Sequence, residues 1–220
     1  MRIFKTVTEA FEHYYSVIDN EKEGPNGTKA IYDQIFRITN TKQLIVQTKW
    51  RKFKESYAIK EWEWYISQNR SAKEIAKHAA IWYNHMDENG NVNSNYGWQW
   101  ARNDQLNYVI DELKRDKYSR RALITIYDAK EHEEYSHDTP CTLNIQFYYT
   151  PDSEELHMTV LMRSNDLWFG FCNDAYCFLK LHQYVCMLMN AEQGTYTHFA
   201  QNLHLYKRHF NKKQLKLKLN

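Results

Sequence analysis

Apolar residues recur along the chain with two different periods, and these periods separate predicted helices from predicted strands. A spacing of three to four residues is typical of an amphipathic helix, whereas alternation or a short apolar run indicates a strand. A first helix is expected to begin at a Thr8 cap, with Phe11, Tyr14, Tyr15 and Ile18 on one face. The other predicted helices cover 53–67, a short segment from Ser71 to the turn at 87–90, 104–115 and 174–189.

The predicted strands cover 30–39, 122–127, 143–149, 155–162 and 203–209, and 214–219 alternates Leu with Lys like an edge strand or a tail. The 174–189 helix is the most apolar, so we expect it to be buried. Strands and helices are interspersed without strict alternation, which favours an α+β fold with a mixed sheet packed against helices. The 220 residues suffice for a substantial core, and we expect one domain over 1–220.

Composition and charge narrow the classes of protein that fit. A net charge of +2 argues against a protein that binds DNA directly, because such proteins usually carry a strong basic stripe. The four cysteines, at positions 141, 172, 177 and 186, lack short paired spacings, which favours reduced thiols and a cytoplasmic location. No apolar run approaches the length of a membrane span, and residues 1–20 contain no signal-peptide pattern.

Nucleophilic and polar residues gather between 140 and 176. Cys141 follows Pro140 at the start of a predicted strand, and a thiolate becomes a potent nucleophile where nearby cations lower its pKa. The candidate cations are Arg120, Arg121 and Arg163. A buried structural cysteine is the alternative interpretation.

A Pro-Cys pair also occurs in zinc deaminases, which need His-x-Glu followed by Pro-Cys-x-x-Cys. His132-Glu133-Glu134 and Pro140-Cys141 begin that pattern, but Asn144 stands where the second cysteine is required. The zinc site would lack a ligand, so no metal is predicted.

Other polar pairs stand at the ends of predicted elements. Arg120-Arg121 precedes a strand and Arg163-Ser164 follows one, so both pairs are candidates for binding a phosphate or are solvated strand ends. Asn173-Asp174 opens the apolar helix, either as a reader of a ligand or as a helix cap. Glu61 lies on an aromatic-rich helix and is either a proton carrier or a solvated residue.

The order of these motifs resembles the thymidylate synthase superfamily over most of residues 55–210. The matching segments are Glu61-Trp-Glu-Trp-Tyr, Ile81-Trp82, Asp87-Glu-Asn-Gly90, Tyr96-Gly-Trp-Gln-Trp100, Ser-Arg-Arg at 119–121, Pro140-Cys141, Gln-Phe at 146–147, Arg-Ser-x-Asp at 163–166 and His-x-Tyr at 204–206. Several departures from the synthase pattern resemble instead the phage branch that hydroxymethylates deoxycytidylate. They are Asn93-Ser-Asn-Tyr-Gly-Trp98, Thr142 after the cysteine, and Arg163-Ser-Asn-Asp-x-x-Phe-Gly-Phe-x-Asn-Asp174.

The resemblance implies a thymidylate synthase-like fold, a sheet-mediated homodimer, and transfer of a one-carbon unit from 5,10-methylenetetrahydrofolate to C5 of dCMP, with water completing a hydroxymethyl group. Cys141 would add to C6, Glu61 would organise water and relay protons, and Tyr96 would assist proton removal at C5. The implied nucleotide-binding residues are Arg163, Ser164, Asn173, Asp174, His204 and Tyr206, with Arg120 and Arg121 from the other subunit. Trp82 and Asp166 would contact the folate.

The choice of base rests on Asp174, because a carboxyl group can accept from the cytosine amino group and, when protonated, donate to N3. We therefore expect a dCMP 5-hydroxymethylase that supplies modified nucleotide for phage DNA in the cytoplasm of an infected bacterium. A dCMP methylase and a dUMP or CMP hydroxymethylase are the alternatives within the class. A nucleotide-binding relative without activity is the alternative outside it.

Overall fold

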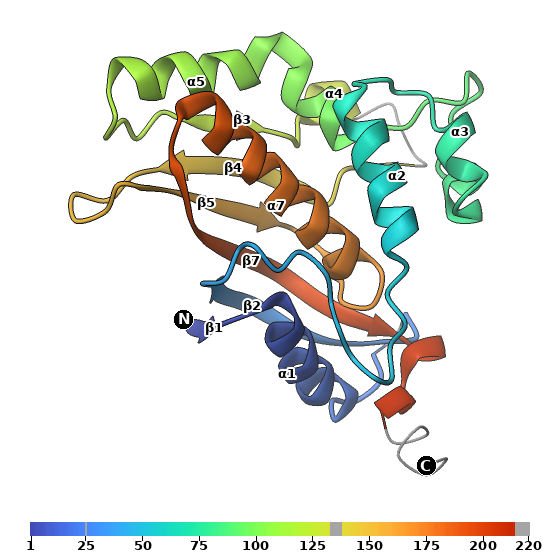
Figure 1. Cartoon of the computed structure of the whole chain (residues 1–220). Coiled ribbons are helices and arrows are strands. Elements are labelled where there is room, and N and C mark those ends of the chain that lie inside the picture. Colours follow the sequence, from blue (N-terminus) through green and yellow to red (C-terminus); the bar gives the residue numbers. More distant parts are fainter. Residues whose placement is uncertain (25, 133–137, 214–220) are drawn as a thin grey trace.

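A computed structural model describes residues 1–24, 26–132 and 138–213, and it contains one mixed sheet flanked by helices (Figure 1). In the described part of the chain the strand order is β1-β2-β7-β5-β4-β3, and the short β6 pairs with β7. The strands are β1 (Arg2–Phe4), β2 (Thr28–Ile38), β3 (Leu123–Thr125), β4 (Thr142–Tyr148), β5 (Glu155–Met162), β6 (Asn165–Asp166) and β7 (Glu192–Tyr206). β7 pairs parallel with β5 and antiparallel with β2, so the sheet is mixed, as predicted.

The helices gather around α7, which crosses the face of the sheet over β4 and β5 (Figure 1). The α-helices are α1 (Val7–Asp19), α2 (Glu55–Ile66), α3 (Lys73–Ala76), α4 (Tyr96–Ala101), α5 (Gln105–Arg115), α6 (Ala129–His132) and α7 (Gly170–Met189). The 3₁₀ helices are η1 (Ala80–Asn84), η2 (Arg102–Asp104) and η3 (Lys207–His209). α7 is buried along most of its length because nearly every turn carries apolar side chains, which confirms the prediction.

The core lies between α7 and one face of the sheet. Alternate residues of β5 are fully buried, from Leu156 through Met158 and Val160 to Met162, as expected for a strand with one face on a core. Thr159 and Leu161, which point to the other face of β5, are partly exposed. The other face of β5 is therefore partly open to solvent in the single chain, although His157 on that face is buried.

Several predicted boundaries are wrong, for identifiable reasons. Thr6 rather than Thr8 caps α1, because the Thr6 hydroxyl accepts from the Glu9 backbone N–H at 3.2 Å. α7 begins at Gly170 rather than at residue 174, so Asp174 lies inside the helix. β7 begins at Glu192 rather than at 203, since pairing to both β2 and β5 holds a segment without clear alternation. The predicted segment 214–219 lies outside the described residues.

Candidate active site

Cys141 lies immediately before β4, in a turn that Arg163 fastens to the end of β5. The Arg163 backbone N–H donates to the Cys141 carbonyl at 2.9 Å. The Arg163 guanidinium donates from Nε to the Pro140 carbonyl at 3.0 Å and from Nη2 to the Thr139 carbonyl at 2.8 Å. The half-buried thiol is therefore held in a fixed place, with the remaining guanidinium N–H groups beside it.

Burial raises the pKa of the Cys141 thiol to about 11, and the carboxyl groups of Asp174, Asp138 and Asp166 add to this shift. Arg163 lowers the thiol pKa, as predicted for a neighbouring cation, but its effect is smaller than that of burial. In the single chain, burial and the three carboxyl groups outweigh the effect of Arg163. A thiol with this pKa is protonated at neutral pH, so the thiolate has to form during reaction.

Asp174 lies in the second turn of α7 and is bound by Asn165 of β6. The Asn165 Nδ2 donates to Asp174 Oδ2 at 2.8 Å. Gly170 permits this pair, since a Cβ at position 170 would lie 3.1 Å from Asn165 Nδ2 and 3.4 Å from Asp174 Oδ2. The helix cap is Phe169, without a side-chain hydrogen bond, so the interpretation of Asn173-Asp174 as a cap is wrong.

Burial raises the pKa of the Asp174 carboxyl well above its usual range, and the nearby Glu61 raises it further, whereas the Asn165 hydrogen bond opposes the shift. Asn165 is itself buried, and its Oδ1 has no hydrogen-bond partner among the described residues. A buried acceptor without a donor is costly, so this oxygen would gain from an N–H donor brought close to it. Asn173 precedes Asp174 on α7 and is half-buried.

Glu61 projects from α2 into the interior and is only 6% exposed. Its Oε1 accepts a hydrogen bond from the Tyr57 hydroxyl at 3.0 Å, and that hydroxyl accepts from Trp82 Nε1 at 2.9 Å. Burial raises the pKa of Glu61 to about 7, against a smaller lowering effect of the Tyr57 hydrogen bond. A carboxyl with this pKa can release and take up a proton near neutral pH.

Tyr96 is the first residue of α4 and is buried against α7, where its ring stacks on Phe178 at 5.6 Å. Gly97 brings α4 close to α2, since a Cβ there would lie 1.6 Å from the Tyr65 carbonyl oxygen. Burial raises the pKa of Tyr96, and both Asp174 and Cys141 contribute to the rise. The structure thus brings Tyr96, Cys141 and Asp174 into one neighbourhood, as predicted.

Asp166 and His204 are paired in register between β6 and β7. The Asp166 carboxylate accepts from the backbone N–H groups of Trp168 at 3.0 Å and Phe169 at 3.2 Å, which fixes the turn into α7. Burial lowers the pKa of His204, whose Nδ1 lies 2.9 Å from Asn202 Oδ1. The half-exposed ring of Tyr206 lies edge-on to His204, with 5.1 Å between centroids.

Not every predicted residue lies in this neighbourhood. Arg120 and Arg121 are exposed and precede β3, whose Leu123 pairs with Gln146 of β4. Cys141 precedes the other end of β4. Within one chain, the two arginines therefore lie at the far end of the strand from the thiol. Ser164, by contrast, directly follows Arg163 and is half-buried.

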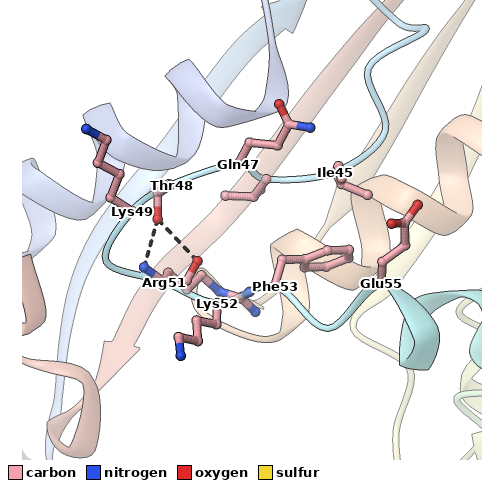
Figure 2. A pocket seen from close by; sticks show the side chains of 9 residues that line it. Ile45, Gln47, Thr48, Lys49, Arg51, Lys52, Phe53 and Glu55 are labelled. Atoms are coloured by element: carbon pink, nitrogen blue, oxygen red, sulfur yellow. Dashed lines mark hydrogen bonds between the residues drawn. The ribbon is translucent and has the colours of Figure 1, made fainter.

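A cavity of about 490 Å³ lies along the segment that leads into α2 (Figure 2). Lys49, Lys52 and Phe53 are among its lining residues, and so is Arg51, which is only 4% exposed. Arg51 donates from Nε and Nη2 to the Trp168 carbonyl at 2.9 and 2.6 Å, so the cavity wall adjoins the Asp166 turn. The Arg51 Nη1 is buried without a hydrogen-bond partner among the described residues, and the guanidinium lies over the rings of Phe53 and Trp168.

Three residues of this site have no role that a sequence motif implies. They are Tyr57, Asn165 and Arg51. Tyr57 precedes Glu61 by one helical turn, so helix geometry alone brings the two side chains together. Asn165 is part of the Arg163–Asp174 pattern that resembles the hydroxymethylase branch, but the pattern implies no individual role for it. Arg51 belongs to an irregular segment without a periodic signal, and no sequence pattern indicated it.

Among the residues that the structure describes, no group of three or more His, Cys, Asp or Glu side chains is arranged to hold a metal ion. The four cysteines are free. In the same described ranges, we find no helix with the length and hydropathy needed to cross a membrane.

Comparisons with known proteins agree on one family. Residues 6–220 match the thymidylate synthase family. A deoxyuridylate hydroxymethyltransferase of Pseudomonas phage M6 is 30% identical over 154 residues, which are 68% of this chain and 44% of that protein. A thymidylate synthase of Bacillus mojavensis is 27% identical over 209 residues, which are 90% of this chain and 73% of that protein.

The fold is also that of a solved synthase. Thermostable thymidylate synthase A of Bacillus subtilis superposes with a TM-score of 0.77 at 21% identity, over 97% of this chain and 84% of that one. The predicted thymidylate synthase-like fold is thereby confirmed.

Proposed function

The chain belongs to the thymidylate synthase family, and from this premise we propose that it is a dCMP 5-hydroxymethylase that uses 5,10-methylenetetrahydrofolate. A pyrimidine nucleoside monophosphate is the substrate class of the family, and one-carbon transfer is its chemistry. The identity of the base and the final addition of water are the parts that we propose. A role in supplying modified nucleotide for phage DNA is part of the same proposal.

The observation that carries the choice of cytosine is the pair formed by Asp174 and Asn165. The Asp174 carboxyl and the unpartnered Asn165 Oδ1 both offer acceptors at one place. The amino group of cytosine has two N–H donors, whereas O4 of uracil has none and would face these acceptors unpaired. The raised pKa of Asp174 favours a protonated carboxyl, which can donate to N3 of cytosine; Asn165 Oδ1 is then the acceptor that distinguishes the amino group from O4.

The side chains around Cys141 would divide the chemistry among them. Arg163 and Ser164 would bind the phosphate, and His204 and Tyr206 would hold the sugar hydroxyl. Cys141 would lose its thiol proton and form a bond from Sγ to C6, which makes C5 nucleophilic; this bond would break again when the 5,6 double bond re-forms in the product. Tyr96 would assist in removing the C5 proton, and Glu61 would take a proton from the water whose oxygen joins the new carbon, since its pKa of about 7 suits both protonation states.

The residues present fit a folate. When bound, methylenetetrahydrofolate supplies a one-carbon unit at the oxidation level of formaldehyde. Trp82 would lie against its ring system and Asp166 would contact its polar edge. A folate also carries a negatively charged glutamate, and the cavity of Figure 2 offers Lys49, Lys52 and the unpartnered Nη1 of Arg51.

A homodimer through the open face of the sheet is part of the proposal. That face is only partly covered in one chain, at Thr159 and Leu161 among other residues. Arg120 and Arg121 are exposed and lie far along β4 from Cys141 of their own chain. A second subunit across the sheet would allow these guanidinium groups to reach the phosphate of the neighbouring site.

Tritium release from C5-labelled nucleotide tests the proposal directly. We expect release from dCMP that depends on methylenetetrahydrofolate and is much slower from dUMP, and we expect Cys141→Ser to abolish it. Faster release from dUMP would reject cytosine as the base. Absence of release from both would reject the enzymatic function and favour a nucleotide-binding relative.

Hydroxymethylation of dUMP is the second candidate, because the Pseudomonas phage M6 relative is named a deoxyuridylate hydroxymethyltransferase. The two candidates share every residue of the mechanism except the reader of the base. The ratio of tritium release from dUMP and dCMP therefore decides between them.

A further inference from the structure

The hydroxyl group of Tyr57 links two elements that the sequence separates, α2 and η1. It donates to Glu61 Oε1 at 3.0 Å and accepts from Trp82 Nε1 at 2.9 Å. An indole N–H can only donate, so Trp82 must be the donor in the second bond. Tyr57 therefore donates its single phenolic proton to Glu61. The donor-to-acceptor direction of the two hydrogen bonds, from Trp82 through Tyr57 to Glu61, is thus fixed.

The hydrogen bond from Tyr57 occupies one oxygen of the Glu61 carboxylate, Oε1, and leaves Oε2 without a hydrogen-bond partner among the described groups. Glu61 is nearly fully buried, so a rotamer change would break the bond to Tyr57 without water to replace it. The bond therefore fixes the carboxylate plane and the direction in which Oε2 points. It also favours the ionised form of Glu61, because the donated proton stabilises the negative charge.

We propose that Tyr57 is a positioning residue that orients Glu61 and sets the balance between its two protonation states. The proposal deepens the proposed function, on which its catalytic consequence rests. With Oε1 bound to Tyr57, Oε2 is the oxygen that takes the proton from water. Without Tyr57, the carboxyl turns freely and is protonated over a wider pH range, so fewer molecules hold a base ready.

Three other titratable groups face Glu61. Tyr65 lies on α2 with it, and Cys177 and Asp174 face it from α7, since the pKa of each is raised by the charge of Glu61. All three stay in place when only Tyr57 is changed. A difference between wild type and a Tyr57 variant therefore isolates the contribution of Tyr57.

The test is a titration of Glu61 in the free protein, by ¹³C NMR of labelled glutamate side chains, with Glu61→Gln assigning the signal. Tyr57→Phe removes the donor to Glu61 together with the acceptor of Trp82 Nε1, and we expect it to raise the Glu61 pKa by about one to two units, the usual worth of a hydrogen bond to a charged group. Trp82→Phe, which leaves Tyr57 a weaker donor, should raise the Glu61 pKa by a smaller amount. Tyr83→Phe is the control, because this neighbour of Trp82 is 57% exposed.

An unchanged Glu61 titration in both Tyr57→Phe and Trp82→Phe would overturn the proposal, and so would an equal shift in Tyr83→Phe. In turnover, we expect Tyr57→Phe to shift the acidic limb of the pH–rate profile upward by the same amount as the NMR titration. An NMR shift in a protein that turns over no nucleotide would support the positioning role and reject the proposed function. The positioning role of Tyr57 and the proposed enzymatic function can therefore be rejected independently of each other.

Discussion

The substitution Asp174→Asn is the sharpest probe of base selection. With Asp174 ionised, O4 of uracil would face acceptors at Asp174 and Asn165, whereas the cytosine amino group meets both with N–H donors. An amide at position 174 can turn its NH₂ toward O4 and so restores one hydrogen bond to uracil. A buried unpaired polar group costs about 1–3 kcal/mol, so restoring one bond corresponds to a change of about 5-fold to 150-fold.

The assay is kcat/KM for tritium release from dCMP and from dUMP, measured for wild type and Asp174→Asn. We expect the dCMP/dUMP ratio to fall by the amount given above, chiefly through faster reaction of dUMP. Asn173→Ala is the matched control, because this residue precedes Asp174 on α7 and should leave the ratio unchanged. A ratio within twofold of wild type in Asp174→Asn would show that Asp174 does not select the base, and a large change in Asn173→Ala would assign base selection to Asn173.

Further predictions address the thiol, the buried carboxyl and the subunit contact. Alkylation of Cys141 should be about 100-fold slower at pH 7 than that of a thiol of pKa 9.0, because its own pKa is about 11; an ordinary rate would contradict its burial. Burial raises the pKa of Glu61 from 4.5 to about 7, so the folded state binds the proton more tightly than the unfolded state. As the pH rises from 4.5 to 7, the wild type should therefore lose about 3 kcal/mol of unfolding free energy relative to Glu61→Gln in urea titrations. Parallel stability curves would contradict this. Mixing inactive Cys141→Ser with inactive Arg121→Ala should restore activity by forming hybrid dimers, and no recovery after confirmed subunit exchange would count against a shared site.

Much of the fold was predictable because its longest elements carry strong periodic patterns. β5 was predicted with its observed bounds, and the apolar α7 was recognised as the buried helix. The first part of β7 was missed because its polar residues pair on both sides with other strands, and such pairing is a tertiary property. β1 was missed because three residues give no period.

The candidate site was predictable where motifs kept their order, as at Cys141, Arg163 and Tyr96. What the sequence could not supply was the balance of forces on each group. Arg163 does lower the thiol pKa, but the extent of burial, which depends on packing, decides the net direction. Likewise, the hydrogen bond between Asn165 and Asp174 could not be predicted from the sequence, because it depends on how the chain turns from β6 into α7.

The central claim is that water, not hydride, completes a one-carbon unit on cytosine. Mass spectrometry of the nucleotide product, after incubation with dCMP and methylenetetrahydrofolate in heavy-oxygen water, tests it most directly. We expect dCMP to gain one CH₂O unit whose oxygen carries the heavy isotope, with no dihydrofolate formed. A gain of a CH₂ unit alone, together with dihydrofolate, would contradict the account.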